Sequence, residues 1–173
     1  NQAIMFFWYN NNRMTLDVVT ENNRFDSNPT VFAANTNYIA TATYDGTLTN
    51  NSRCRLYSGQ TLVRTALEAS ATIPDYDSPL IIGATHVGDN RPFDGYISEI
   101  IFYRRILNVT EKIVVDNYLS SKYNIALSAN DFYAGDTPGN GNFDREVAGI
   151  GRFSATDNHQ EFFTSVSGGM GMR

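Results

Sequence analysis

The sequence predicts an all-β fold of two antiparallel sheets, with one short amphipathic helix near residues 109–123. Aromatic residues make up 13% of the 173 residues, whereas charged residues make up only 18%, less than the usual quarter. Short runs of β-branched and aromatic residues alternate with clusters of Asn, Asp, Gly and Pro. Many short strands at this spacing are typical of a β-sandwich or barrel.

Several runs are predicted strands, because each is rich in Val, Ile, Thr, Tyr or Phe and is bounded by turn residues. They are residues 3–9, 14–20, 30–35, 38–44, 53–59, 60–68, 79–87 and 96–103. The turns between them include "YNNNR", "DSNPT", "YDGTLTNN" and "PDYDSP". These residue types favour the backbone angles of tight turns, so each run is expected to end where its turn begins.

Cys54 is the single cysteine, so the chain can form neither an internal disulfide nor a cysteine-based zinc site. In "RCRLY" the alternation of a strand places Cys54 and Leu56 on one face and Arg53, Arg55 and Tyr57 on the other. Cys54 is therefore predicted to be a small buried hydrophobic side chain.

The carboxylates Asp94 and Glu99 raise the question of an acid pair in "DGYISEIIFYRR". A glycosidase needs two carboxylates that face one cleft, about 5 to 10 Å apart. In a strand over 96–103, Glu99 shares a face with Ile97 and Ile101, whereas Asp94 precedes a glycine and has the opposite parity. We therefore expect Glu99 to be a partly buried acceptor for Arg104, Arg105 or backbone amides.

The segment "NVTEKIVVDNYLSSKYNI" breaks the strand pattern and predicts a helix. Asn108 stands three residues before Glu111, the spacing of a capping box, and the helix is expected to end near Asn124. Lys112 and Asp116 are expected to lie away from the buried stripe. That stripe consists of residues at spacings of three and four, Val115, Tyr118, Leu119 and Lys122.

The net charge of −5, without a basic block, argues against nucleic acid or an anionic membrane surface as a partner. No apolar run approaches the ~20 residues that cross a bilayer, so membrane insertion is not expected. The first residues, "NQAIMFFWYNNNR", lack the charged region and cleavage site of a signal peptide. A secreted parent protein would carry its signal upstream.

The segment "PFDGYISEIIFYRRILNVTEKIVVDNYLSSKYNI" resembles the closing part of the concanavalin A-like lectin/glucanase superfamily, specifically its laminin-G-like jelly-roll modules. "YDGT" followed by "RLYSGQTLV", and then "PLIIGA", is similar to an upstream hairpin and strand of those modules. The resemblance implies a jelly-roll sandwich over residues 1–127 that lacks its first strands, with ligand loops at one rim.

The resemblance does not imply an enzyme, because no acid cluster of the type E-x-D-x-x-E occurs in the chain. Non-catalytic modules of this kind bind carbohydrate or protein, or act as spacers. The expected function is a non-catalytic carbohydrate-binding or adhesion module of a large extracellular or cell-surface protein. A structural spacer or protein-interaction domain is one alternative, and a glycoside hydrolase or lyase is another. The expected partners are a glycan or cell-surface protein and neighbouring domains of the same polypeptide.

Residues 128–173 are rich in Gly, Asn and Asp and are predicted to be a linker followed by the start of a second β-rich region. "REVAGIGR" and the "SVSGG" tail resemble the stretch that follows such modules in large surface proteins of Bacteroidetes-type bacteria. That resemblance implies a bacterial, exported parent protein.

Two loops supply the candidate ligand contacts. "PDYDSP" presents Tyr76 between two acids, and "HVGDNRP" presents Asp89, Asn90 and Arg91. A planar ring and polar side chains of this kind can hydrogen-bond sugar hydroxyls, although polar turns that bind nothing have the same composition. Trp8 could also stack on a sugar, but in a strand this apolar a core position is favoured.

A calcium loop is the one cofactor site to weigh. Asp136, Asn140, Asn142 and Asp144 carry oxygen ligands at close spacing in "GDTPGNGNFD". The segment lacks the acid spacing and terminal Glu of an EF-hand. A Gly-Asn turn without metal is therefore favoured, with calcium as the alternative.

Overall fold

The computed structural model describes residues 4–9, 12–18, 25–49, 52–65, 70–77, 79–84, 92–141, 143, 148–152 and 158–164. The chain divides into two compact units. The first consists of Asn1–Thr36, Ala40–Ser58 and Leu62–Ile106, and the second of Asn37–Ile39, Gly59–Thr61 and Leu107–Arg173. The domain boundary predicted between residues 127 and 128 lies within the second unit and stays a prediction.

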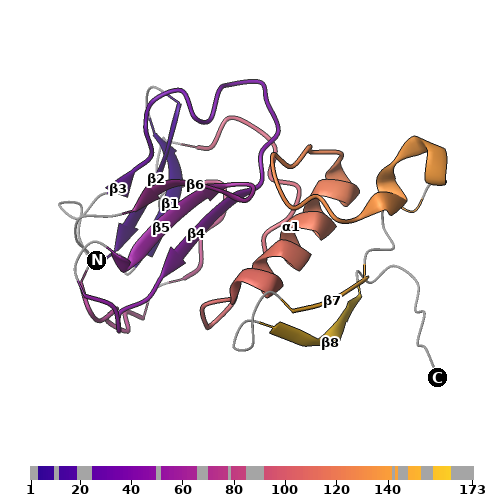
Figure 1. Cartoon of the computed structure of the whole chain (residues 1–173). Helices are drawn as coiled ribbons and strands as arrows, with labels where there is room; N and C mark the ends of the chain where they lie inside the picture. The colour runs from indigo at the N-terminus through magenta and orange to yellow at the C-terminus, as the bar shows by residue number, and fades with distance from the viewer. Residues whose placement is uncertain are drawn as a thin grey trace. The chain divides into compact units, whose positions relative to one another are not determined.

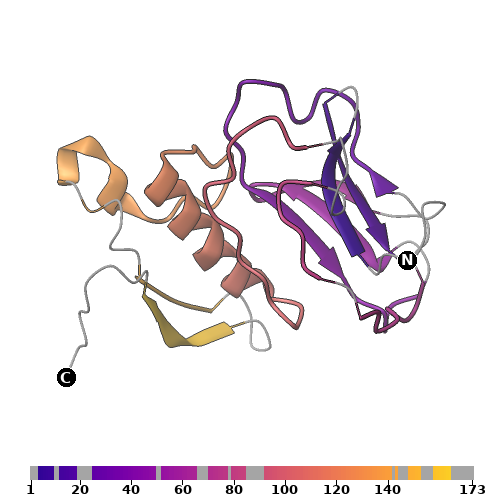
Figure 2. The ribbon, with the colours of Figure 1, turned by 180° about the vertical axis from the view of Figure 1, so that it is seen from behind.

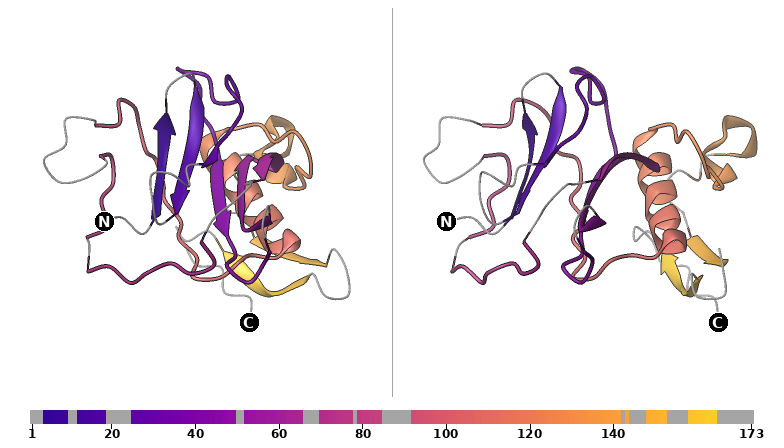
Figure 3. Two further views of the ribbon diagram at one scale, coloured as in Figure 1. Left: turned by 90° about the vertical axis from the view of Figure 1, so that its left-hand side faces the viewer. Right: turned by 60° about the vertical axis from the view of Figure 1, so that its left-hand side comes forward.

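The first unit contains two antiparallel three-stranded sheets (Figure 1). One has the order β1 (Ile4–Tyr9), β2 (Arg13–Val18), β3 (Phe25–Asp26), and the other β4 (Ala40–Tyr44), β5 (Cys54–Ser58), β6 (Thr61–Thr65). Figure 3 shows the sheets as separate layers. The predicted strands at 3–9, 14–20, 38–44, 53–59 and 60–68 are confirmed, while a complete jelly roll stays a prediction.

The core lies between these two sheets. Leu16 and Val18 of β2 pack against Cys54 and Leu56 of β5, and all four side chains are buried. Alternation along each strand brings these residues to the inner face, as predicted for Cys54 and Leu56. Partly buried side chains surround them: Ala42, Tyr44, Val63 and Ile73.

The predicted strands at 30–35 and 79–87 are wrong over their described residues. Thr30 and Asn35 have φ angles of 69° and 59°, a left-handed conformation that a strand cannot contain. Gly83 has a φ of 81° and likewise interrupts the described part of the second run, residues 79–84. What remains there is an isolated bridge between Ala84 and Pro92.

The predicted strand at 96–103 is also wrong, because the structure assigns no strand between residues 93 and 108. Strand formation needs a neighbouring strand that accepts and donates the ladder hydrogen bonds. Among the described strands, none pairs with this segment. β-Propensity alone therefore did not produce a strand here.

The predicted helix is confirmed as α1 (Val109–Tyr123) in the second unit. The Asn108 side-chain oxygen accepts from the Glu111 amide at 2.8 Å, and the Asn108 amide donates to Glu111 Oε2 at 2.9 Å. Both arms of the predicted capping box are therefore present. The helix ends at Asn124, whose φ of 52° is left-handed, as is usual for a residue just after a helix.

The buried face of α1 differs from the predicted apolar stripe. Asp116 was expected to lie away from that stripe, yet it is among the most buried side chains of the described residues. Val115, Leu119 and Lys122 are only half-buried. The other buried residues of the helix are Thr110, Asn117, Tyr118, Ser120 and Ser121. This face is therefore polar, and hydrogen bonds rather than apolar contacts must compensate its burial.

The second unit also contains two short 3-10 helices, Ala134–Asp136 (η3) and Pro138–Asn140 (η4). β7 (Ala148–Arg152) and β8 (Asn158–Thr164) form an antiparallel pair that packs against α1 (Figure 2). The tail is thus β-containing, in agreement with the expected β-rich region.

A search of the described residues for a helix that could cross a bilayer finds none of sufficient length and hydropathy.

Candidate ligand-binding site

The face of the β1–β2–β3 sheet that points away from the core is polar. Because Leu16 and Val18 face the core, Arg13, Thr15 and Asp17 of β2 face the other way. Asp17 is only 3% exposed although it lies on this outer face. A carboxylate held this deeply on the side opposite the core is unusual for a strand whose role is packing alone.

A cluster of four side chains at one end of this face combines charge with an aromatic ring. We call Tyr9, Arg13, Thr15 and Asp26 the Arg13 cluster. Thr15 Oγ1 donates to Asp26 Oδ1 at 2.6 Å, and Arg13 Nη1 lies 3.6 Å from Asp26 Oδ2. The Arg13 and Asp26 side chains are 30% and 26% exposed, so both ions are open to solvent in part.

The ring of Tyr9 is held beside these ions by the strand pairing. Tyr9 lies directly opposite Arg13 across β1 and β2, which places their side chains on the same face. Phe7 packs edge-on against Tyr9, with 6.1 Å between ring centroids. Tyr9 is half-buried. A half-exposed ring, a guanidinium and a carboxylate together can stack on and hydrogen-bond a sugar.

Asp17 and Asp26 bring two carboxylates to one face of one sheet. Asp26 lies opposite Thr15, so Asp17 is its diagonal neighbour across β2 and β3. Diagonal neighbours in antiparallel strands are about 7 to 8 Å apart, which is within the range of glycosidase acid pairs. In contrast, Asp94 is exposed and Glu99 is half-buried in a segment that is not a strand.

The Arg13 cluster was not predicted from the sequence. The signal was present, because Arg13, Thr15 and Asp17 occupy alternate positions of "RMTLDV". Asp26 gave no signal, because its strand has only two residues. Trp8, on the opposite parity, packs against the buried Phe32 with 6.1 Å between ring centroids, in agreement with the favoured core position.

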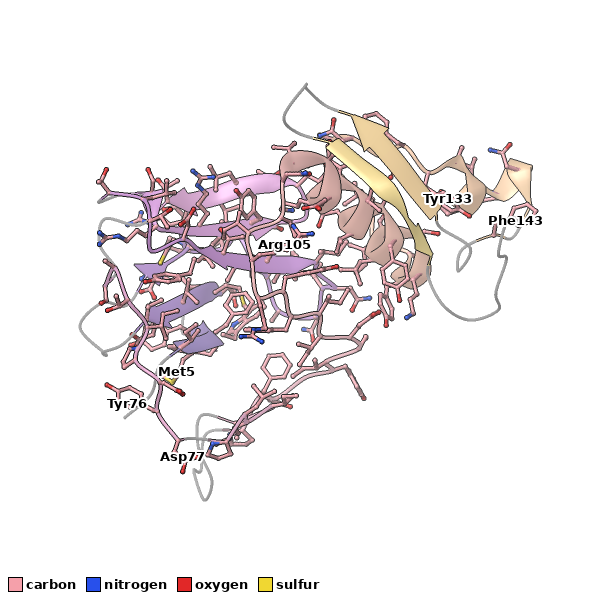
Figure 4. The ribbon with its side chains drawn as sticks, turned by 90° about the horizontal axis from the view of Figure 1, so that it is seen from below. Met5, Tyr76, Asp77, Arg105, Tyr133 and Phe143 are labelled. Atoms are coloured by element: carbon pink, nitrogen blue, oxygen red, sulfur yellow. The ribbon has the colours of Figure 1, made fainter. Side chains whose placement is uncertain are left out.

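Tyr76 is the described member of the predicted ligand loops. It is half-buried between the exposed Asp75 and Asp77, and Figure 4 labels it with Asp77 on the loop. The loop is anchored by Ile73, which packs on the core, and at Ser70, whose carbonyl accepts from the Tyr44 hydroxyl at 2.6 Å.

The other members of that predicted set lie outside the described residues. These are Asp89, Asn90 and Arg91. The structure therefore does not bring the four candidates together, and their grouping stays a prediction.

Two of the predicted calcium ligands, Asp136 and Asn140, lie on η3 and η4, whereas Asn142 and Asp144 lie outside the described residues. Asn140 donates its side-chain amide to Ala134 O at 2.8 Å, as in a self-closed turn. Within the described ranges no group of three His, Cys, Asp or Glu side chains could hold a metal. The calcium alternative stays a prediction.

The loop that carries Asp136 and Asn140 is closed by an aromatic contact instead. Tyr133 donates its hydroxyl to the carbonyl of Phe143 at 2.5 Å, and both residues are labelled in Figure 4. Burial raises the pKa of Asp131, and the negative charge of Asp136 raises it further. The two carboxylates therefore repel each other slightly.

Cys54 offers no nucleophile. Its thiol is buried in the core, and this burial raises its pKa to about 11 despite the nearby charge of Arg53. Since the thiolate is the reactive form, the thiol is inert at neutral pH.

Comparison with known proteins gives one match. A family model described as "Concanavalin A-like lectin/glucanases superfamily" matches residues 1–111. No curated protein and no solved structure matches the chain.

Proposed function

Because the chain belongs to the concanavalin A-like lectin/glucanases superfamily, we propose that it is a non-catalytic carbohydrate-binding or adhesion module. The superfamily includes both lectins and hydrolases, so membership alone does not choose between binding and cleavage. The proposed context is a large extracellular or cell-surface protein of bacterial origin. Its partners there would be a glycan or cell-surface protein and the neighbouring domains.

The observation that carries the proposal is the Arg13 cluster. Tyr9 supplies a ring for stacking, while Arg13 and Asp26 supply donors and acceptors that remain partly open to solvent. Protein–sugar recognition needs both kinds of group, because a pyranose has apolar C–H patches beside its hydroxyls. Asp26 is already oriented by Thr15, so a ligand would meet a preorganised acceptor.

A glycan array followed by calorimetry on the intact chain tests this proposal. We expect saturable binding to one sugar class and at least ~10-fold weaker binding for Arg13→Gln and Tyr9→Leu, since each removes one contact of roughly 1.4 kcal/mol or more. Arg64→Gln is the matched control, because Arg64 is an exposed arginine on β6. Binding that survives both cluster variants would point to the predicted loop set at Tyr76 and residues 89–91.

Asp17 and Asp26 favour a glycoside hydrolase as the second candidate function, because they share one sheet face at a glycosidase-like separation. Release of new reducing ends from a polysaccharide, lost in Asp17→Asn and in Asp26→Asn, would establish this alternative. Near-UV circular dichroism of each variant would show that the loss is not unfolding.

A structural spacer or protein-interaction unit is the remaining reading. It predicts a folded chain that binds no member of a broad glycan library and cleaves none. Specific capture of a cell-surface protein under the same conditions would then support it.

A further inference from the structure

Residues 93–106 form an exposed apolar segment of the first unit, which we call the 93–106 segment. Tyr96 is 100% exposed and Phe102 is 80% exposed. The other exposed apolar side chains of the segment are Phe93, Ile97, Ile100 and Ile106. Single exposed apolar residues are common on proteins, but a continuous run of this size is typical of an interaction surface.

The burial of this segment alternates with the period of a strand. Glu99, Ile101 and Tyr103 are half-buried, whereas Ser98, Ile100, Phe102 and Arg104 are exposed. One face therefore contacts its own unit and the other is uncovered. Since no described strand pairs with the segment, an added strand would complete a sheet here.

We propose that residues 98–106 pair with the same residues of a second copy of this chain, as antiparallel strands related by a two-fold axis at Phe102. In a symmetric antiparallel pair, one residue of each strand lies opposite itself, because facing residues must share a face. The choice of axis residue then fixes the whole register.

Charge complementarity selects the axis. With Phe102 opposite itself, Glu99 of each copy lies opposite Arg105 of the other, so two opposite-charge pairs form. With the axis at Ile101 or Ile100, Glu99 lies opposite a tyrosine or an isoleucine instead. The segment carries its acid and its base on either side of Phe102, so it is its own complement.

The same register covers the exposed apolar side chains. The two Phe102 rings meet at the axis on the uncovered face, and each Ile100 lies beside the aliphatic stem of Arg104 of the other copy. On the half-buried face, each Ile101 lies opposite Tyr103. A second copy therefore satisfies both the apolar and the charged groups of the segment.

Sedimentation equilibrium on the full chain at micromolar concentration tests the proposal. We expect twice the 19.3 kDa of one chain, and a monomer for Phe102→Lys, because two ammonium groups would then meet at the axis. Leu80→Lys is the control, because Leu80 is 87% exposed but lies outside the segment, and it should remain dimeric. A monomeric wild-type chain, an open-ended assembly, or a dimer of Phe102→Lys would overturn the proposal.

A charge-swap experiment tests the register. Glu99→Arg and Arg105→Glu should each be monomeric alone, because each homodimer would face like charges. An equimolar mixture should form a heterodimer, because one chain then supplies two arginines and the other two acids. Arg105 is exposed and is labelled in Figure 4. An ion pair within one chain cannot be restored by mixing, so a mixture that stays monomeric would overturn the pairing. If Glu99→Arg does not fold, the Phe102→Lys comparison decides.

Discussion

Asp116 is a carboxylate for which burial outweighs its ion pair. It is 1% exposed and pairs with Lys112, whose ammonium also donates to the Gly59 carbonyl at 2.8 Å. Burial raises the pKa of Asp116 to about 6 from 3.8, although the charge and hydrogen bond of Lys112 lower it. Burial of the charged form therefore costs more than the lysine returns.

The raised pKa predicts a pH dependence of stability. Between pH 3.8 and about 6 the folded chain holds a proton that the unfolded chain has lost. Folding is therefore favoured at the acid end, and this contribution is lost as pH rises through about 6. We expect the unfolding free energy of the wild type, relative to Asp116→Asn, to fall by on the order of 3 kcal/mol from about pH 4 to about pH 7.

Urea unfolding of both proteins across that range measures the difference. The subtraction removes the contribution of other acids. A difference that rises with pH would mean that Lys112 outweighs burial, contrary to the raised pKa.

Asn117 is a second buried polar side chain, and its hydrogen bonds are satisfied. Its amide donates to the carbonyls of Ile113 and Asn130, both at 2.9 Å, and its oxygen accepts from the amides of Phe132 and Tyr133 at 2.7 and 3.0 Å. The side chain thereby fixes residues 130–133 against α1.

Removal of the Asn117 side chain would leave these backbone groups without their partner. We expect Asn117→Ala to lower the unfolding free energy by about 3 kcal/mol, since each unsatisfied buried group costs about 1 to 3 kcal/mol. Asn37→Ala is the matched control, because it removes the same amide from an exposed asparagine of the second unit. It should change the unfolding free energy by less than ~0.5 kcal/mol. Equal effects in the two variants would show that Asn117 does not hold the segment.

Among the elements, α1 depends on its first turn. Asn108 and Glu111 satisfy each other's backbone amides, which are otherwise left open at a helix start. We expect Asn108→Ala to lower the unfolding free energy by about 1 kcal/mol, whereas Asn108→Asp should keep it nearly unchanged. Thermal melts followed at the helical circular dichroism band would distinguish them, and a loss in Asn108→Asp equal to that in Asn108→Ala would contradict the cap.

The same elements show what local sequence can predict. The capping box and the strand alternation of "RCRLY" depend on residues close together in the chain, and both were predicted. The strand at 96–103 was not realised, because a strand also requires a partner that local sequence does not specify. β3 was missed, because two residues carry no period. The polar face of α1 was missed, because its compensation comes from backbone groups at 113 and 130–133 and from Gly59.

For the whole molecule, the superfamily and the two-sheet layout could be inferred from the sequence, but the candidate site could not. The Arg13 cluster joins residues from β1, β2 and β3, so it exists only once the register of Tyr9 with Arg13 and of Thr15 with Asp26 is fixed. The loop candidates were chosen for composition alone. Composition indicates which side chains can bind, whereas pairing decides which of them meet.

The layout of the first unit makes a prediction about coupling between its sheets. Leu16 lies on β2 and Leu56 on β5, and both belong to one buried cluster. Each Leu→Ala change should lower the unfolding free energy by about 2 to 5 kcal/mol. Because both changes open the same region of the core, the double variant should depart from the sum by about 0.5 to 3 kcal/mol.

A double-mutant cycle by urea denaturation measures this departure. The matched control pairs Leu16→Ala with Leu62→Ala, because Leu62 is an exposed leucine on β6 and should add independently, within ~0.5 kcal/mol. Coupling for the Leu16–Leu56 pair alone means that the two sheets share one core and unfold together. Strict additivity in both cycles would mean that the sheets are stabilised separately, and a sandwich would then be the wrong description of this unit.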